Sequence, residues 1–418
     1  MNKNKLGIMI IGLGGAVAST VIAGIELLKN GKIGTEGLPL ADLPENLTEG
    51  IADYKNLVFT GWDMNADDLS AAATTHNVLT LQQFSAVSEE LQAAKPLAAV
   101  VNSAFCHNIE GKNVFAAANH SAAVEKLRED IRRFKNDSGA ESIVVINLAS
   151  TESFVAKEPE IFATLENFEK ALGENSPEIS PAMIYAYAAI GEKIPYGNFT
   201  PSVAADIPAL VEYAEKKGVP IAGKDGKTGQ TFIKTVIAPG LKARALKVDG
   251  WFSTNILGNR DGFALQHPDS LKSKITTKGS VLDDILGYKV EDHLVDIRYY
   301  RPRGDNKEAW DNIDIIGFMG QPMQLKINFL CKDSILAAPL VIEIARLLDY
   351  AQRCGEKGVQ AQLSTFFKLP QVTNEQNEMP EHSVHKQQQM LLDWLEAHAA
   401  DSSQNVGNTA ELAATAGE

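Results

Sequence analysis

Cysteine is scarce in this sequence, and its scarcity argues against two kinds of site. Three cysteines occur among 418 residues, and Cys106, Cys331 and Cys354 lie far apart. An odd and scattered set matches neither a disulfide framework nor the CxxC spacing of a structural metal site. The composition therefore favours a reducing cytoplasm as the working environment.

A basic surface is lacking as well. The chain has 39 Lys and Arg residues against 53 Asp and Glu residues, and its net charge is −14 without a basic block. An acidic surface repels phosphates, which argues against nucleic-acid binding. With 44% hydrophobic and 22% charged residues, the composition is that of an ordinary globular protein. The length allows two or three domains.

Charge is missing from one apolar stretch, LGIMIIGLGGAVASTVIAGI at 6–25. Its basic start and the small residues AVA at 16–18 imitate a signal peptide, and its length equals that of a membrane helix. A cluster of glycines in its first half is unusual for both. A third interpretation divides the stretch into a strand buried on both faces, a glycine turn and a helix.

The following sequence favours this third interpretation. Residues 12–18 form a GxGGxxA pattern, in which N–H groups at a helix start bind a pyrophosphate. Further predicted strands alternate with helical segments, at 56–63, 96–103, 142–150, 193–199 and 219–225. Such alternation predicts an α/β fold with a doubly wound parallel sheet, no membrane span, and ligands at the carboxyl ends of the strands.

Asp63 closes the second predicted strand, where an acidic side chain typically binds the adenosine ribose of NAD. It lies 49 residues after Gly14, whereas about 20 is usual. The alternative is that Asp63 caps a helix at 66–73.

Two later segments concentrate polar and basic residues. GKDGKTGQT at 223–231 follows a predicted strand and precedes a helical pattern; it lacks GxxxxGK[ST], so it predicts a phosphate cradle and not an ATPase loop. The stretch 258–284 contains Lys272, Lys274 and Lys278. It is either a solvated basic face or a set of amines with lowered pKa values that can act as acids and bases.

The C-terminal half is more mixed. Residues 250–332 alternate in the manner of antiparallel strands half exposed on one face, which predicts an α+β layer open to a partner subunit. A long helix is predicted at 334–354, and Lys368 in a turn before Pro370. His382 and His385 are predicted to lie on a surface helix, and 401–418 to form a flexible tail.

Taken in order, these motifs strongly resemble the myo-inositol-1-phosphate synthase family over roughly residues 6–370. The matching pieces are GLGG, GWD, ASTE (149–152), GKDGKTGQT, NILGNRDG (255–262), SKITTKGSVLDD, RPRGDNKEAWD (301–311), CKDSILAAPL (331–340) and FFKLP. Any one piece is weak evidence, but their shared order is specific.

The resemblance implies an isomerase that converts D-glucose 6-phosphate into an inositol phosphate for inositol and phospholipid synthesis. The reaction proceeds by oxidation at C5, enolisation, intramolecular aldol closure and reduction, and NAD is regenerated in each turnover. The implied fold is an NAD-binding Rossmann-like domain with an inserted α+β oligomerisation domain, in a cytoplasmic homotetramer. The expected division is 1–230 for NAD binding, 231–336 for catalysis and association, 337–400 returning to the first domain, and 401–418 as tail.

The resemblance also implies site residues. For NAD they are Gly12, Gly14, Gly15, Ala16, Asp63, Asn147, Ser150, Thr151 and Asp261. For the substrate phosphate they are Thr228, Gly229, Gln230, Thr231 and Lys278. The catalytic set is Lys274, Lys278, Lys307, Lys368, Asp225 and Asp333.

Each catalytic lysine has an implied role. Lys274 takes the C5 hydroxyl proton, Lys368 stabilises the C5 oxyanion and Lys307 stabilises the C1 alkoxide, while Asp225 and Asp333 orient these amines. Arg260 and Lys224 depart from the family pattern, so a divalent or monovalent cation stays open as a further requirement. The alternative activity is an NAD(P)-dependent sugar-phosphate dehydrogenase that releases NADH.

Overall fold

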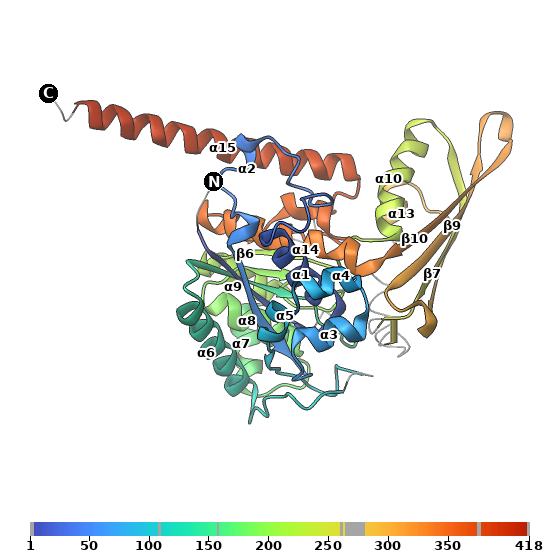
Figure 1. The fold of residues 1–418 in the computed structure, drawn as a ribbon. Helices are drawn as coiled ribbons and strands as arrows, with labels where there is room; N and C mark the ends of the chain where they lie inside the picture. The colour runs from blue at the N-terminus through green and yellow to red at the C-terminus, as the bar shows by residue number, and fades with distance from the viewer. Residues whose placement is uncertain are drawn as a thin grey trace.

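The computed structural model describes residues 4–107, 110–156, 159–259, 262–263, 281–373 and 378–415, with side chains up to residue 399. The chain builds a helix-covered parallel sheet, and a smaller sheet stands at one side of it (Figure 1).

The larger sheet has seven strands in the order β11-β6-β5-β4-β1-β2-β3, and all of its pairings are parallel. Its strands are β1 (Leu6–Ile11), β2 (Leu57–Asp63), β3 (Leu97–Ala98), β4 (Ser142–Asn147), β5 (Tyr196–Asn198), β6 (Pro220–Gly223) and β11 (Gly358–Val359). The strand order reverses at β1, which is the topology of a doubly wound NAD-binding sheet. The predicted fold class is therefore confirmed.

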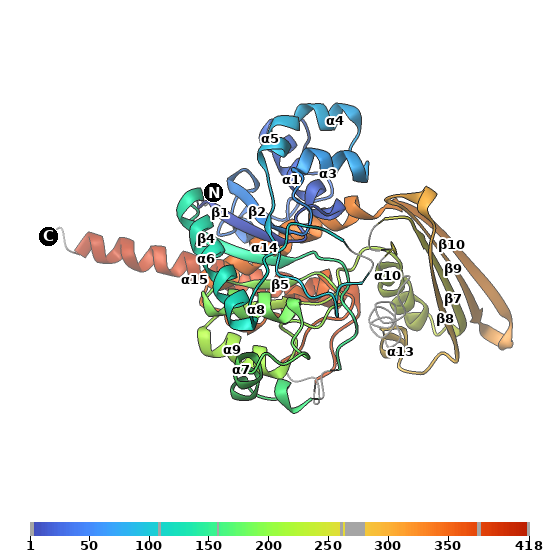
Figure 2. The same ribbon diagram turned by 90° about the horizontal axis from the view of Figure 1, so that it is seen from below.

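Helices cover both faces of this sheet (Figure 2). α1 (Ala16–Lys29) and α14 (Asp333–Arg353) pack together on one face, and α6 (His120–Ser138) and α8 (Pro181–Gly191) on the other. The remaining helices around the sheet are α2 (Glu45–Thr48), α3 (Leu69–His76), α4 (Leu81–Ala86), α5 (Ser88–Ala93), α7 (Leu165–Gly173) and α9 (Pro208–Lys217).

Burial on both faces explains the apolar opening of the chain. All six residues of β1 are buried; Leu6, Ile8 and Ile10 join the core beneath α1 and α14, whereas Met9 and Ile11 join the core beneath α6 and α8. Successive strand side chains point to opposite faces, so two covered faces require a continuous apolar run. Within the described ranges, no helix is both long and apolar enough to cross a membrane.

The smaller sheet has the order β10-β9-β7-β8. Its strands are β7 (Lys247–Leu257), β8 (Asp292–Tyr299), β9 (Asn306–Ile316) and β10 (Pro322–Lys332). The prediction of antiparallel strands holds for β9 and β10 but is wrong for β8, which pairs with β7 in parallel. The chain crosses over through α13 (Val281–Leu286) between these two strands, and a crossover returns a strand in the same direction.

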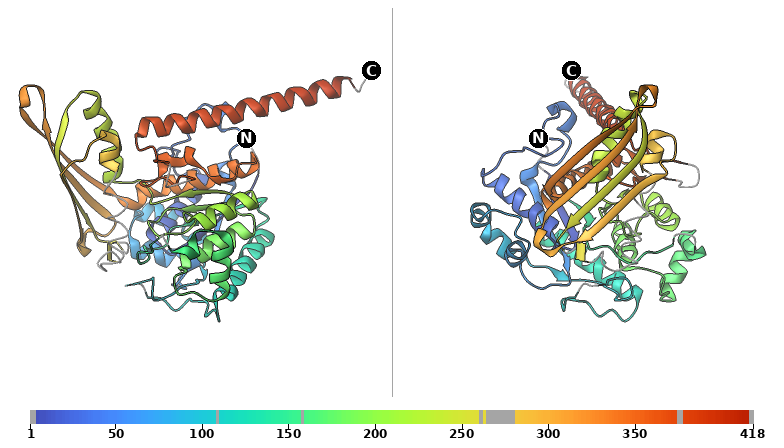
Figure 3. Two further views of the ribbon diagram at one scale, coloured as in Figure 1. Left: turned by 180° about the vertical axis from the view of Figure 1, so that it is seen from behind. Right: turned by 90° about the vertical axis from the view of Figure 1, so that its right-hand side faces the viewer.

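One face of the smaller sheet is covered by α10 (Gln230–Ala243) and α13, which share an apolar core with Trp251 and Ile313. No helix among the described residues covers the other face, which is turned toward the viewer in the right panel of Figure 3. α10 begins where the predicted insertion begins, and β10 leads directly into α14. The division of the chain into domains stays a prediction.

The C-terminal segment returns to the larger sheet through the 3-10 helix η5 (Ala361–Phe366) and then forms α15 (Val384–Thr415). The backbone of 401–415 is helical, where the composition predicts a flexible tail. The surface prediction is wrong for His382, which precedes α15 and is buried.

Candidate active site

The turn between β1 and α1 is held by its main chain. The N–H groups of Gly12 and Leu13 donate to the carbonyl of Trp62 at 2.8 and 3.1 Å. Gly12 has a φ of +88°, and a Cβ there would stand 3.0 Å from the backbone of Ala149. Only glycine fits both conditions. The turn thus directs the first N–H groups of α1, which begins after Gly15, to the carboxyl ends of the strands.

Asp63 braces this turn. Its carboxylate accepts the N–H of Gly14 at 2.8 Å and that of Asn65 at 2.9 Å. The cap of α3 is Asp68, which accepts from the first turn of that helix. The alternative of Asp63 as a helix cap is therefore wrong, and its carboxylate stands at the end of β2, beside the turn.

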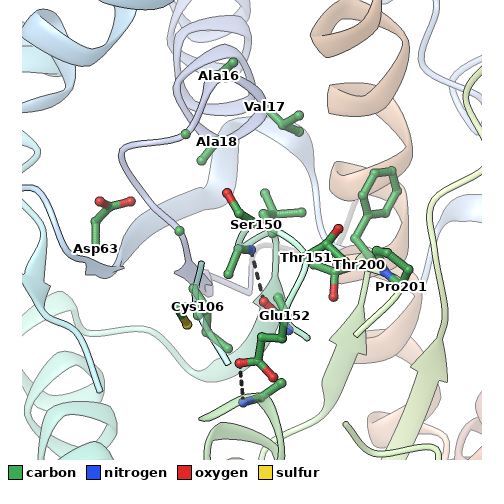
Figure 4. Close-up of a pocket in the computed structure, with 18 of the residues that line it drawn as sticks. Ala16, Val17, Ala18, Asp63, Cys106, Ser150, Thr151, Glu152, Thr200 and Pro201 are labelled. Carbon is green, nitrogen blue, oxygen red and sulfur yellow. Dashed lines mark hydrogen bonds between the residues drawn. The ribbon is translucent and has the colours of Figure 1, made fainter. Parts of the chain in front are cut away.

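The end of β4 supplies the opposite side of the turn. Asn147 is buried, and its side-chain oxygen accepts the N–H of Ala149 at 3.0 Å. This bond holds the start of the ASTE segment against Gly12, and Ser150 and Thr151 follow it along the wall of a cavity (Figure 4).

That cavity has a volume of about 690 Å³ and joins the two halves of the predicted site. The predicted residues that line it are Gly12, Gly15, Ala16, Asp63, Asn147, Ser150, Thr151, Asp225, Thr228, Asp333 and Lys368. They come from six segments spread over more than 350 positions, so the fold gathers both ends of the chain at one place.

Asp225 and Lys368 form a buried ion pair in the cavity wall. The Lys368 ammonium lies 2.7 Å from Asp225, and both side chains are less than 10% exposed. Main-chain bonds set the register, because the Lys368 N–H donates to the Asp225 carbonyl at 2.6 Å and the Lys227 N–H to the Phe366 carbonyl at 2.8 Å. These main-chain bonds position the pair, and they do not depend on either side chain.

A second pair lies on the other side of the phosphate loop. The Lys307 ammonium lies 3.3 Å from Asp333, whose same oxygen accepts the Thr228 hydroxyl at 3.1 Å. A Cβ at Gly229 would stand 3.0 Å from the Lys307 ammonium. Lys307 therefore lies against the start of α10, although its residue is absent from the cavity lining.

The side chain of Gln230 is turned away from this loop. Its amide donates to the carbonyls of Thr254 at 2.9 Å and Trp310 at 3.2 Å, and its oxygen accepts from Asn255. Gln230 and Thr231 are both buried at the first positions of α10. At this helix start, the main-chain N–H groups of these residues are available to bind an anion. The Gln230 side chain instead anchors α10 on the smaller sheet.

Three predicted residues, Lys274, Lys278 and Asp261, lie outside the described residues. The same holds for Lys272 and Arg260. Lys224 is described, and its ammonium lies 2.7 Å from Asp206 in a buried pair beside the cavity.

Sequence reasoning missed two ionisable groups near the cavity. Glu152 lines it, and burial raises the pKa of its carboxyl to about 7. Lys227 lies behind the loop, where burial lowers the pKa of its amine to about 7 and Gln387 accepts from it at 2.5 Å. Both residues belong to motifs noted in the sequence, but a motif does not show which way a side chain points.

The geometry fits a dinucleotide next to a small phosphorylated ligand. A glycine turn, free helix-start N–H groups and a strand-end carboxylate are what a dinucleotide requires. The other end offers a second helix start with two ammonium groups, each positioned by a carboxylate. Among the residues that the structure describes, no three His, Cys, Asp or Glu side chains are grouped so as to hold a metal ion.

Comparison with known proteins agrees with this geometry. Residues 45–396 match the model of a family described as myo-inositol-1-phosphate synthase. The chain is 42% identical to inositol-3-phosphate synthase 1 of Bacteroides thetaiotaomicron over 405 residues, which is 93% of this chain and 94% of that protein. It is 32% identical to inositol-3-phosphate synthase of Saccharomyces cerevisiae, over 85% of this chain and 75% of that one.

Solved structures show the same likeness. The inositol-3-phosphate synthase of Caenorhabditis elegans superposes with a TM-score of 0.88 at 26% identity, over 95% of this chain and 86% of that one. A myo-inositol-1-phosphate synthase-related protein of Thermotoga maritima gives a TM-score of 0.77 at 26% identity, over 93% of this chain and 98% of that one.

Proposed function

The chain belongs to the myo-inositol-1-phosphate synthase family and catalyses the inositol-3-phosphate synthase reaction, and we propose how its residues divide that work. The proposed substrate is D-glucose 6-phosphate and the product a myo-inositol phosphate, formed by C5 oxidation, enolisation, aldol closure and reduction.

NAD is held at the first end of the cavity. Gly12, Gly14 and Gly15 shape the turn through their own main-chain bonds, so that the first N–H groups of α1 face the pyrophosphate, and Asp63 accepts from the adenosine ribose hydroxyls. Ala16, Asn147, Ser150 and Thr151 complete the proposed cofactor wall, with Asp261 assigned from sequence. When bound, NAD supplies the oxidant for C5 and returns the same hydride equivalents at the end of the turnover.

The two lysine–aspartate pairs act on the substrate oxygens. Lys368 stabilises negative charge on the C5 oxygen during enolisation, because a fixed ammonium in a buried site favours an oxyanion strongly. Asp225 accepts a hydrogen bond from this ammonium at 2.7 Å and so holds it in position. Lys307 stabilises the alkoxide that develops at C1 as the ring closes, and Asp333 holds both Lys307 and the Thr228 hydroxyl.

The start of α10 binds the phosphate. Main-chain N–H groups of Gly229, Gln230 and Thr231 face it beside Thr228, whose hydroxyl is held by Asp333, in agreement with the favourable field of a helix N-terminus. Lys278 and Lys274 are assigned from sequence, to the phosphate and to the C5 hydroxyl proton respectively. For Lys274→Ala we expect loss of turnover with NAD binding nearly intact.

One observation carries this assignment: a single cavity joins the glycine turn of β1 to the buried Lys368–Asp225 pair and to Asp333 of the second pair. The test is to incubate the protein with glucose 6-phosphate and a catalytic amount of NAD. We expect an inositol phosphate by NMR and no net growth of NADH absorbance. Stoichiometric NADH without a cyclic product would instead show a sugar-phosphate dehydrogenase.

Self-association is proposed for the uncovered face of the smaller sheet. Leu294 and Leu330 are 57% and 62% exposed there, and Phe252 and Trp310 form an edge-to-face pair. Apolar side chains on an open sheet favour a partner surface, so we propose a homotetramer. Light scattering of the purified protein tests the subunit number.

Three further assignments rest on the family. The proposed compartment is the cytoplasm, which cell fractionation tests, and the proposed use of the product is inositol phospholipid synthesis. A divalent or monovalent cation is the remaining assignment. Activity after dialysis against EDTA, and in sodium against potassium buffers, shows whether one is required.

A further inference from the structure

Glu152 occupies a particular place in the cavity wall. It ends the ASTE segment, five positions after the last residue of β4, and it is 6% exposed. Its main-chain N–H donates to the Ser202 hydroxyl at 3.0 Å, and its Oε1 accepts the N–H of Ala182 at 3.0 Å, near the start of α8. Figure 4 shows the side chain on the same wall as Cys106.

The second carboxylate oxygen of Glu152 is unsatisfied. Among the described residues, none forms a hydrogen bond with its Oε2, which is buried. A buried carboxylate oxygen without a donor is unfavourable and calls for an explanation. Burial raises the pKa of this carboxyl to about 7, and the Ser180 hydroxyl and the Ala182 N–H oppose the rise.

The ionisable groups that face Glu152 do not supply the missing hydrogen-bond donor to its Oε2. Burial, and after it the nearby Glu152 carboxylate, raises the pKa values of the Cys106 thiol and the Tyr196 phenol, so both stay neutral near pH 7, and neither forms a hydrogen bond with Oε2. No described cation pairs with Glu152. A hydrogen-bond donor from a bound molecule would therefore gain an acceptor that the protein leaves unused.

The strand order indicates which part of a dinucleotide is near. β2, which ends at Asp63, and β4 flank β1 on opposite sides. In a doubly wound sheet the two nucleotides lie on the two sides of the central strand, with the pyrophosphate between them. Asp63 marks the adenosine side, so Glu152 belongs to the nicotinamide side. The carboxamide is the group through which nicotinamide donates an N–H.

We propose that Glu152 is a cofactor-positioning residue whose free carboxylate oxygen accepts a hydrogen bond from the nicotinamide carboxamide. The terminal torsion of a glutamate side chain rotates at little cost. Because Glu152 already lines the cavity, a small rotation of its carboxylate turns Oε2 toward the cavity. The bond would fix the rotation of the nicotinamide ring relative to Lys368 and Asp225. This inference rests on the proposed NAD site.

The first experiment removes the donor from the ligand. In the 3-acetylpyridine analogue of NAD, a methyl group replaces the amide NH₂. Titration calorimetry without substrate should show that the wild type binds this analogue about 10- to 100-fold more weakly than NAD, as for loss of a charge-assisted bond. In Glu152→Gln, the side-chain oxygen stays with Ala182 and an NH₂ takes the place of Oε2, so both ligands should bind equally weakly.

The control is Glu110→Gln, which makes the same charge change at an exposed residue of the cavity wall. It should keep the wild-type preference for NAD. An unchanged preference in Glu152→Gln would overturn the proposal, even if the protein makes inositol phosphate. Conversely, loss of the preference for NAD over the analogue in Glu152→Gln supports the proposal whatever product is formed. The proposal for Glu152 and the proposed function can therefore fail independently.

A second measurement needs no variant. The bond requires the ionised carboxylate, so the wild-type preference for NAD over the analogue should be greatest near pH 8.5. It should fall as the pH drops below about 7, the raised pKa of the free carboxyl. NAD binding at pH 7 should also release protons, seen as a dependence of the binding heat on the buffer. A preference that stays constant from pH 5.5 to 8.5 would contradict the proposal.

Discussion

The two ends of the cavity are built by different means. At the proposed cofactor end, one short continuous segment shapes the site through its main chain, and its decisive atoms are the first N–H groups of α1, which the β1–α1 turn directs. At the substrate end, the decisive atoms are ammonium and carboxylate groups from three segments far apart in sequence, namely 225–229, 307–333 and Lys368. The first end depends on backbone conformation and the second on the balance of buried charge.

This difference determines which changes each end tolerates. A backbone site accepts many side chains but not a Cβ where the chain has a positive φ or a close neighbour. A buried ion pair tolerates few substitutions, because removal of one partner leaves the other charge buried and uncompensated. Mutations at the two ends should therefore separate cofactor affinity from turnover.

The largest effect is expected for Lys368→Met at the substrate end. Loss of one preorganised group that stabilises an oxyanion lowers kcat by about 10²–10³-fold. NAD affinity should change less than twofold, because the cofactor turn is untouched. Steady-state kinetics and calorimetry measure the two quantities on the same preparation.

A double variant separates catalysis from stability in this test. Lys368→Met alone leaves Asp225 buried and unpaired, which should lower the free energy of unfolding by about 3–5 kcal/mol. Adding Asp225→Asn removes that charge and should restore most of the stability but none of the turnover. Recovery of turnover in the double variant would show that Lys368 acts only as a structural partner.

Gly12→Ala should have the next largest effect, at the cofactor end. A residue with a Cβ at a φ of +88° costs about 1–3 kcal/mol, and the Cβ would also press on the backbone of Ala149. We expect NAD to bind about 10- to 100-fold more weakly. The matched control is Gly24→Ala inside α1, where a Cβ meets nothing within 4 Å. That variant should bind NAD normally and unfold at a slightly higher temperature.

Asp63→Asn tests the side chain that braces the β1–α1 turn at the proposed cofactor end. An asparagine oxygen can accept only one of the two N–H groups that Asp63 now holds, from Gly14 and Asn65. We expect about tenfold weaker NAD binding, as for loss of one bond to a charged group. The variant should also discriminate less against NADP, because the negative charge that repels a 2′-phosphate is gone. An unchanged ratio of the two dissociation constants would remove Asp63 from cofactor selection.

The same comparison explains how far the sequence could be interpreted. The strand, turn and helix at the proposed cofactor end were predictable because their determinants are local: the apolar run of β1, the glycines and the helical spacing of α1 stand next to one another. The motif order then indicated the family. The parallel pairing of β8 with β7 was not predictable, because it depends on how the chain crosses over through α13.

Side-chain direction was the other unpredictable quantity. GKDGKTGQT predicts a helix start that binds phosphate, yet it does not show that Gln230 faces the smaller sheet while Lys227 faces α15. The burial of Glu152 likewise depends on the start of α8, where the Ala182 N–H donates to its carboxylate. Such directions follow from which elements pack together, and that is decided by tertiary structure.

An effect on stability, with the smallest effect on turnover, is expected for Lys227→Met behind the phosphate loop. The pKa of this amine is lowered from 10.5 to about 7 by burial, so the unfolded state binds more protons than the folded state between these values. The lysine's contribution to stability therefore rises with pH across this window and is constant below it. Relative to Lys227→Met, the wild type should gain up to about 1 kcal/mol per pH unit from pH 7 to 10. Urea unfolding at several pH values measures this slope. Parallel curves of stability against pH for the two proteins would show that Lys227 stays charged in the folded state. The phosphate loop would then contain a buried charge, as the two lysine–aspartate pairs do.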